Sequence, residues 1–199
     1  NIESSETYQE KDQELEVAKQ TLQADKYTVE SGVVTDNSNG GIPFTGSTRI
    51  IFPDGKEYEG QFLDGLMHGA GRLELPNGDK YEGDMRQGMI DGYGTYHHND
   101  GREYKGDFVA SKKNGNGIFT YPDLTSYAGQ FIDDLFSGKG EYRFADGSHY
   151  RGNFDHGSFD GFGELVYSDG TVYRGHFICR MARYIQDSSW MVSFMVRVN

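Results

Sequence analysis

Apolar and aromatic residues alternate with polar residues along most of the chain. In the segment from Tyr58 to Phe62, alternation places Tyr58, Gly60 and Phe62 on one side of a strand and Glu59 and Gln61 on the other. The pattern has a fixed period of 23 residues, because copies of Tyr-x-Gly begin at Tyr58, Tyr81, Tyr104, Tyr127, Tyr150 and Tyr173. A short period that is kept without slippage predicts an array of one structural unit.

Each unit reads as two short strands joined by turns. The first strand carries a column of large apolar residues: Phe62, Met85, Phe108, Phe131, Phe154 and Phe177. The second strand carries two columns on one side: Leu73, Tyr96, Phe119, Tyr142 and Leu165, then Leu75, His98, Tyr121, Phe144 and Tyr167. Its other side is mostly polar, with Arg72, Thr95, Ile118, Glu141 and Glu164. We therefore predict hairpins with one aromatic face and one polar face that is exposed to solvent.

Glycine recurs at fixed positions in the strands and in the turns. Strand glycines pack nothing themselves, so their recurrence predicts aromatic rings from the neighbouring strand lying over them. The turn glycines follow Asp or Asn, as hairpin turns with positive φ require: Gly55, Gly78, Gly101, Gly147 and Gly170. Leu124 interrupts this column, so its turn is either of another type or strained.

These segments resemble the MORN repeat, whose name stands for membrane occupation and recognition nexus. The resemblance rests on Tyr-Glu-Gly-Gln-Phe at 58–62, Asp-Gly-Leu-Met-His-Gly-Ala-Gly at 64–71 and Pro-Asn-Gly-Asp-Lys-Tyr at 76–81, and it covers residues 46–177. It implies an all-β fold, an elongated single-layer antiparallel sheet of tandem hairpins with a trough-like section, and a scaffolding role. The sequence departs from the repeat at Ser111 to Asn114 and at Asp133-Asp134, which replace a glycine-containing turn.

The two ends differ from the array. Residues 1–45 form an acidic extension with a helix-prone run from Glu6 to Lys26 and a linker at 31–41. The chain begins with Asn1 and not with methionine, which leaves open that it is a piece of a longer protein. Residues 178–199 form a mildly basic, apolar tail. The tail either caps the open edge of the last hairpin or contacts a partner through Trp190 and Phe194.

No constellation of side chains points to catalysis. Cys179 is the single cysteine, and His97 and His98 are strand neighbours that face opposite sides, so neither favours a metal site. The recurring aspartates sit in turns, where they bond to the backbone. We therefore expect no enzymatic activity, no cofactor and no metal. With no signal peptide and no apolar run long enough to span a membrane, we expect a cytoplasmic protein.

Charge separates the classes of partner. The formal net charge is −12, of which 9 acidic and 3 basic residues in 1–45 contribute −6. Nucleic acids and anionic membranes bind clustered Lys and Arg, so we expect neither as a partner.

A row of aromatic residues remains as the candidate binding surface. We expect a protein partner, a helix or an extended peptide, held by these rings. The resemblance extends this to a motor or axonemal component in a cytoskeletal or ciliary assembly. The alternatives are an accessory module of a methyltransferase or a lipid kinase, or a lipid-binding module; the oligomeric state stays open. The predicted groove residues are Tyr81, Tyr96, Tyr104, Phe108, Phe119, Tyr121, Tyr127, Phe131, Tyr142 and Phe144.

Overall fold

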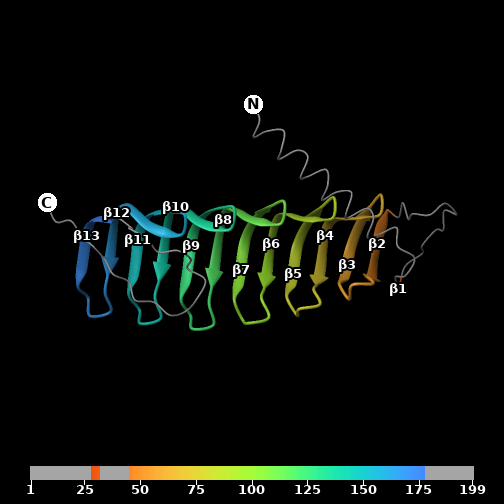
Figure 1. Cartoon of the computed structure of the whole chain (residues 1–199), viewed down its shortest axis with the longest axis horizontal. Helices are drawn as coiled ribbons and strands as arrows, with labels where there is room; N and C mark the ends of the chain where they lie inside the picture. Colours follow the sequence, from red (N-terminus) through yellow and green to blue (C-terminus); the bar gives the residue numbers. More distant parts are fainter. Residues whose placement is uncertain (1–27, 32–44, 178–199) are drawn as a thin grey trace, which may run out of the picture. The chain divides into compact units, whose positions relative to one another are not determined.

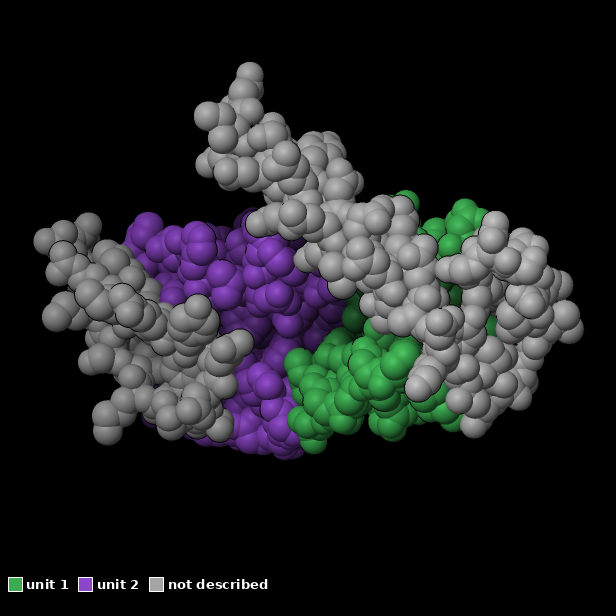
Figure 2. Space-filling model, turned by 45° about the vertical axis from the view of Figure 1, so that its right-hand side comes forward, with its two compact units in different colours: residues 1–99 green, residues 100–199 purple. Residues whose placement is uncertain are grey.

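The computed structural model describes residues 28–31 and 45–177. It divides into two compact units, residues 1–99 and 100–199 (Figure 2). The described residues contain strands and turns and no helix. The all-β, antiparallel fold predicted from the alternation is therefore confirmed.

The described residues of unit 1 form six strands that pair antiparallel in chain order (Figure 1). The second strand of each hairpin is longer than the first, because it carries the extra residues of a bulge. The strands are β1 (Thr28–Ser31), β2 (Gly46–Ile51), β3 (Glu57–Leu63), β4 (Leu66–Glu74), β5 (Lys80–Arg86) and β6 (Met89–His97).

Within residues 100–177, unit 2 has the same pattern in seven strands, also paired antiparallel in chain order (Figure 1). They are β7 (Glu103–Val109), β8 (Lys112–Thr120), β9 (Ser126–Ile132), β10 (Leu135–Arg143), β11 (His149–Asp155), β12 (Ser158–Val166) and β13 (Val172–Phe177).

The register places equivalent residues of the two strand types opposite each other. In the first hairpin of unit 2, Tyr104 pairs with Phe119 and Gly106 with Gly117, and the register then shifts before Phe108 pairs with Lys113. The bulge changes the direction of the side chains that follow it in β8. Phe108 and its partner Lys113 therefore both lie on the face that carries Tyr104. We call this the aromatic face and the opposite one the outer face.

The aromatic face holds the core. The tyrosine that opens each of the first five repeats is buried, and Tyr104 is 0% exposed. The apolar column at the end of each first strand is buried beside it. Polar positions of the outer face, such as Glu59 and Gln61, are exposed. Alternation therefore assigned the two faces correctly. The buried members of these columns are Tyr58, Tyr81, Tyr104, Tyr127 and Tyr150, and Phe62, Met85, Phe108, Phe131, Phe154 and Phe177.

Turns at both ends of the strands contain a residue with positive φ. This residue is glycine in most of the turns, but in each kind of turn some repeats have another residue there. Leu124 has φ 68°, in the left-handed region of the turn glycines, and its N–H donates to Tyr121 O as the N–H of Gly147 donates to Phe144 O. Its turn is therefore of the same type, with strain added, which settles the alternative left open by the sequence. At the other end, Ser111 (φ 64°) and Asp134 (φ 70°) stand where other hairpins have glycine.

At the ends of the chain, one strand was not predicted and two predicted segments lie outside the described residues. Strand β1 was not predicted: it pairs with β2 at the edge of a segment interpreted as helix and linker. The helix expected between Glu6 and Lys26 lies outside the described residues. So does the tail at 178–199, with Trp190 and Phe194.

Candidate functional site

The tyrosine that opens each of the first five repeats lies over two glycines. A Cβ added to Gly106 would lie 2.6 Å from the Oη of Tyr104, and one added to Gly117 would lie 2.5 Å from the same atom. The Tyr104 hydroxyl donates to the carbonyl of Asp107 across 2.9 Å. The prediction of a ring from the neighbouring strand is right for Gly117. It is wrong for Gly106, because that glycine lies two residues after Tyr104 in the same strand. The ring of Tyr104 lies along its own strand and covers Gly106.

The buried rings contact one another in a repeating arrangement. Tyr127 meets Phe131 edge-on, with ring centroids 5.1 Å apart, and stacks on Phe136 at 3.9 Å with 15° between the planes. Tyr150 stacks in the same way on Phe159, at 3.9 Å and 14°. Such pairs stabilise by about 1 kcal/mol each beyond the area they bury.

Sequence reasoning missed the column to which Phe136 and Phe159 belong. Its signal was present, since apolar residues recur there with the period of the array, and it was overlooked because the bulge breaks strict alternation. One member of the column is charged. The column is Met67, Ile90, Lys113, Phe136 and Phe159.

Burial divides the predicted groove residues into two sets. Seven belong to the buried layer and present no surface to a partner in this structure: Tyr81, Tyr104, Phe108, Phe119, Tyr127, Phe131 and Tyr142. Three are only partly buried and stay candidates for contact: Tyr96, Tyr121 and Phe144. Which of these residues bind a partner stays a prediction.

Three partly exposed aromatic residues of unit 2 follow the ends of the second strands, on the aromatic face. Tyr121 contacts Phe119 and Phe144 contacts Tyr142, each pair with centroids 4.9 Å apart. Tyr167 continues the series and is 42% exposed. Burial raises the pKa of Tyr121, and the nearby charge of Arg102 acts in the opposite direction. We call Tyr121, Phe144 and Tyr167 the ring ladder.

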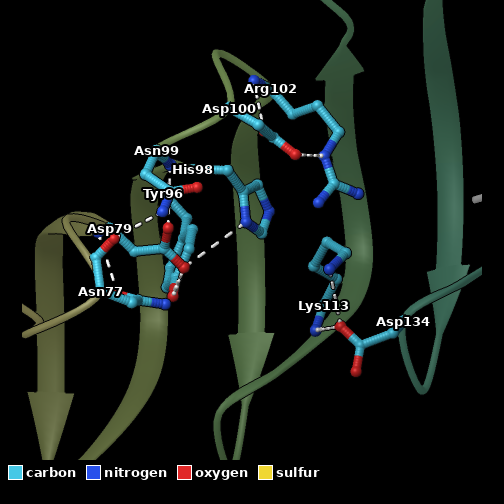
Figure 3. A network of polar contacts seen from close by, with 9 residues as sticks. All are labelled: Asn77, Asp79, Tyr96, His98, Asn99, Asp100, Arg102, Lys113 and Asp134. Atoms are coloured by element: carbon cyan, nitrogen blue, oxygen red, sulfur yellow. Dashed lines mark hydrogen bonds and ion pairs between the residues drawn. The ribbon is translucent and has the colours of Figure 1, made fainter.

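In unit 1, a polar cluster occupies the equivalent end of the aromatic face (Figure 3). Asp79 is buried and accepts from the backbone N–H of Asn99 at 2.8 Å and from the hydroxyl of Tyr96 at 2.9 Å. His98 Nδ1 lies 3.7 Å from the same carboxylate. Burial acts to raise the pKa of Asp79, but the hydrogen bonds, with Asn77 among the donors, and the charge of His98 hold that pKa below its ordinary value.

In unit 2, two cations lie on the aromatic face (Figure 3). Lys113 Nζ is 2.9 Å from Asp134 Oδ1 and lies over the rings of Tyr104 and Phe119, 5.8 and 5.7 Å from their centroids. Arg102 Nε donates to Asp100 Oδ2 at 2.7 Å. Asp134 also accepts from the backbone N–H of Lys113, so the turn and the strand are tied together.

The described part of the chain offers no site for a metal ion. It contains no group of three or more His, Cys, Asp or Glu residues suitably placed to hold one. Among the same residues, no helix is long and apolar enough to cross a membrane.

A family model for the MORN repeat matches five tandem segments, at residues 58–80, 81–101, 104–126, 127–149 and 150–172. The chain belongs to the MORN repeat family. Each matched segment from 104 onwards opens on the tyrosine that covers a glycine pair and ends beyond the next turn. The glycine and tyrosine columns of the MORN repeat are thus explained here by close packing of a ring on bare backbone.

Among solved structures, the chain is similar to the TCP domain of SAS-4 (dCPAP) of Drosophila melanogaster, in complex with a proline-rich motif of Ana2 (dSTIL). The two are 20% identical, the match covers 65% of this chain and 71% of that chain, and the TM-score is 0.44. No curated protein sequence matches the chain.

Proposed function

We propose that this MORN-repeat chain is a non-enzymatic scaffold that docks a helical or extended segment of another protein on its aromatic face. The carrying observation is the ring ladder of Tyr121, Phe144 and Tyr167. These rings remain accessible, whereas the layer that supports them is buried. Tyrosine and phenylalanine offer large contact area at a small cost in conformational entropy, as anchors of a protein interface do.

The spacing of the ladder suits a regular peptide. Successive ladder residues lie one repeat apart, which is two strands, or about 9.6 Å across a sheet. Seven residues of an α-helix advance about 10.5 Å, and three residues of a polyproline II segment advance about 9.3 Å. A partner of either kind can therefore present one apolar side chain to each hairpin. An irregular loop has no such repeat.

The setting that we propose is a cytoskeletal, ciliary or motor assembly in the cytoplasm. This extends the scaffolding role that the MORN-repeat resemblance implies. The net charge of −12 supports a protein partner over nucleic acid or an anionic membrane.

Affinity capture with ladder variants tests the proposal. The full chain, its Tyr121→Ala and Phe144→Ala variants and the control Ile118→Ala are used as baits, and captured proteins are quantified by mass spectrometry. Ile118 is the matched control, because it lies in β8, the strand that leads to Tyr121. Its side chain is on the outer face and is 50% exposed. A partner segment should lose on the order of 2 kcal/mol of binding free energy with Tyr121→Ala. It should keep its affinity for Ile118→Ala.

Thermal melts of all four proteins accompany the capture. Loss of the partner with an unchanged melting temperature supports a docking role for the ladder. A partner that binds every variant equally, or affinity that falls only in step with stability, contradicts the proposal.

A further inference from the structure

The charges of unit 2 are sorted between its faces. In the described part of this unit, every acidic side chain lies in a turn or on the outer face, as burial and register assign them. The aromatic face carries two charged residues, Lys113 within β8 and Arg102 immediately before β7. The two charged side chains that this face contributes are therefore both cations, and each is paired with a turn aspartate: Lys113 with Asp134 and Arg102 with Asp100.

Lys113 occupies a position where the fold favours an apolar side chain. The equivalent residues are Met67, Ile90, Phe136 and Phe159, and two of these stack on the tyrosine of their own hairpin. The Lys113 side chain is only 20% exposed and lies over Tyr104 and Phe119. Drawing an ammonium group partly out of water is unfavourable, so an apolar residue would serve the core better.

The turn that pairs with Lys113 has an aspartate where other hairpins have glycine. Asp134 adopts φ 70°, at a position that Gly88 and Gly157 fill in other hairpins. Aspartate enters this left-handed region more readily than most residues, although glycine does so at no steric cost. Asp134 holds Lys113 through both its ammonium and its backbone N–H. The turn thus fixes one cation at a position where the fold favours an apolar side chain.

We propose that Lys113 is a specificity-determining residue that selects a partner segment with an acidic side chain beside its apolar anchors. The ammonium has three N–H donors and Asp134 takes one, so an incoming carboxylate can accept another. Arg102, near Tyr121, adds a second positive charge to the same face. This inference rests on the proposed function and names the chemistry of the occupant, an acidic protein segment.

Selection of random peptides displayed on phage, with the intact chain as the target, tests the inference. Peptides that compete for the ring ladder are identified by their loss of binding to Tyr121→Ala. Among these, we expect Asp and Glu to be enriched relative to the starting library. A synthetic copy of the best peptide should bind Lys113→Met about tenfold more weakly than wild type, the loss of a charge-assisted hydrogen bond.

Three further measurements sharpen the result. Lys113→Met should melt at the wild-type temperature or above it, because methionine fits the column. Lys113→Arg should keep most of the affinity. Lys112→Met, at a neighbouring position with a side chain 57% exposed, should bind within twofold of wild type.

The outcomes separate the two proposals. Ladder-dependent peptides without acidic enrichment, or equal binding to wild type and Lys113→Met, overturn the inference and leave the docking function intact. Absence of any ladder-dependent peptide counts against the docking function, and the inference falls with it. Binding of phosphatidylserine vesicles that is lost in Lys113→Met would assign the cation to lipid and would also overturn the inference.

Discussion

Asp79 and Asn99 connect two successive turns of unit 1: the Asp79 carboxylate accepts from the backbone N–H of Asn99 across 2.8 Å. Ser148 and Ser168 repeat the relationship in unit 2, where the Ser148 hydroxyl accepts from the Ser168 N–H across 3.0 Å. The acceptor precedes its donor by 20 residues in both cases.

Proline explains two of the positions where this bond is absent. The residues 20 positions after Lys56 and Arg102 are Pro76 and Pro122, which have no N–H to donate. Cations, which cannot accept, stand at those two positions. At these two positions, a turn residue that cannot donate thus faces a side chain that cannot accept.

Replacing Ser148 tests this connection directly. We expect Ser148→Ala to lower the free energy of unfolding by about 1 kcal/mol, because the buried acceptor of the Ser168 N–H is lost. Thr171→Ala, at the next equivalent and exposed position, is the control and should change stability by less than about 0.5 kcal/mol. Urea denaturation measures both. Equal losses would show that the turn-to-turn bond contributes nothing.

Asp79 gives the fold a dependence on acid pH. Its folded pKa lies below its ordinary value, so the stability that it contributes is present above the unfolded pKa of about 3.9 and is lost as pH falls through the folded pKa. Asp79→Asn should melt below wild type at neutral pH. The difference should shrink as pH drops below about 4. A difference that stays constant from neutral to acid pH would contradict the assignment.

Leu124 is the most accessible target for stabilisation. It is 79% exposed and has φ 68° where equivalent turns have glycine, so Leu124→Gly should raise the free energy of unfolding by about 1 kcal/mol. The reverse change in an equivalent turn, Gly147→Leu, should lower it by a similar amount. Thermal melts read out both variants. A loss of stability in Leu124→Gly would mean that the leucine makes contacts that outweigh its strain.

The glycines beneath the tyrosine rings should tolerate no side chain. Gly117→Val should lower the free energy of unfolding by on the order of 3 kcal/mol, since its Cβ would lie 2.5 Å from atoms of Tyr104. Glu59→Val introduces the same residue on the outer face and should have a small effect. Chemical denaturation of the two variants compares them, and similar losses would argue that the faces are assigned in reverse.

Alkaline pH should unfold the array through its buried tyrosines. Burial raises the pKa of Tyr58 and of Tyr150 to about 12, and backbone hydrogen bonds act in the opposite direction. The stability associated with these hydroxyls is present below their ordinary pKa of about 10 and is lost as pH rises through the folded value. Ultraviolet titration should therefore show tyrosines that ionise late and together with unfolding. Tyr58→Phe should remove one of them; an unchanged late phase would contradict the assignment.

The sequence predicted what depends on periodicity. The face of Tyr58 and Phe62, the strand pairs and the glycine turns follow from alternation and from the 23-residue period. It could not predict depth of burial. Tyr104 and Tyr121 are both aromatic residues on one face, yet only packing of the neighbouring rings shows that the first is covered and the second is accessible.

The column of Lys113 was missed for a different reason. Alternation fails where the bulge inserts residues opposite Gln61, Gln130 and their equivalents, so parity alone places Met67 and Phe136 wrongly. The partner of Lys113 was equally hidden. Asp134 was recognised as a departure from glycine, but its contact with Lys113 joins two hairpins and depends on the register between them.

The ring of Tyr104 and the two glycines that it covers all belong to one repeat, and Phe131 of the next repeat packs on that ring with centroids 4.9 Å apart. Insertion or deletion of a complete 23-residue hairpin therefore rejoins equivalent surfaces, whereas loss of a single strand separates a tyrosine from one of its glycines. The array can therefore gain or lose length only in whole hairpins if this packing is to be kept. Each duplicated hairpin would add one accessible ring about 9.6 Å further along the sheet. On the proposed function, the number of repeats therefore sets the length of the partner segment that the array can contact.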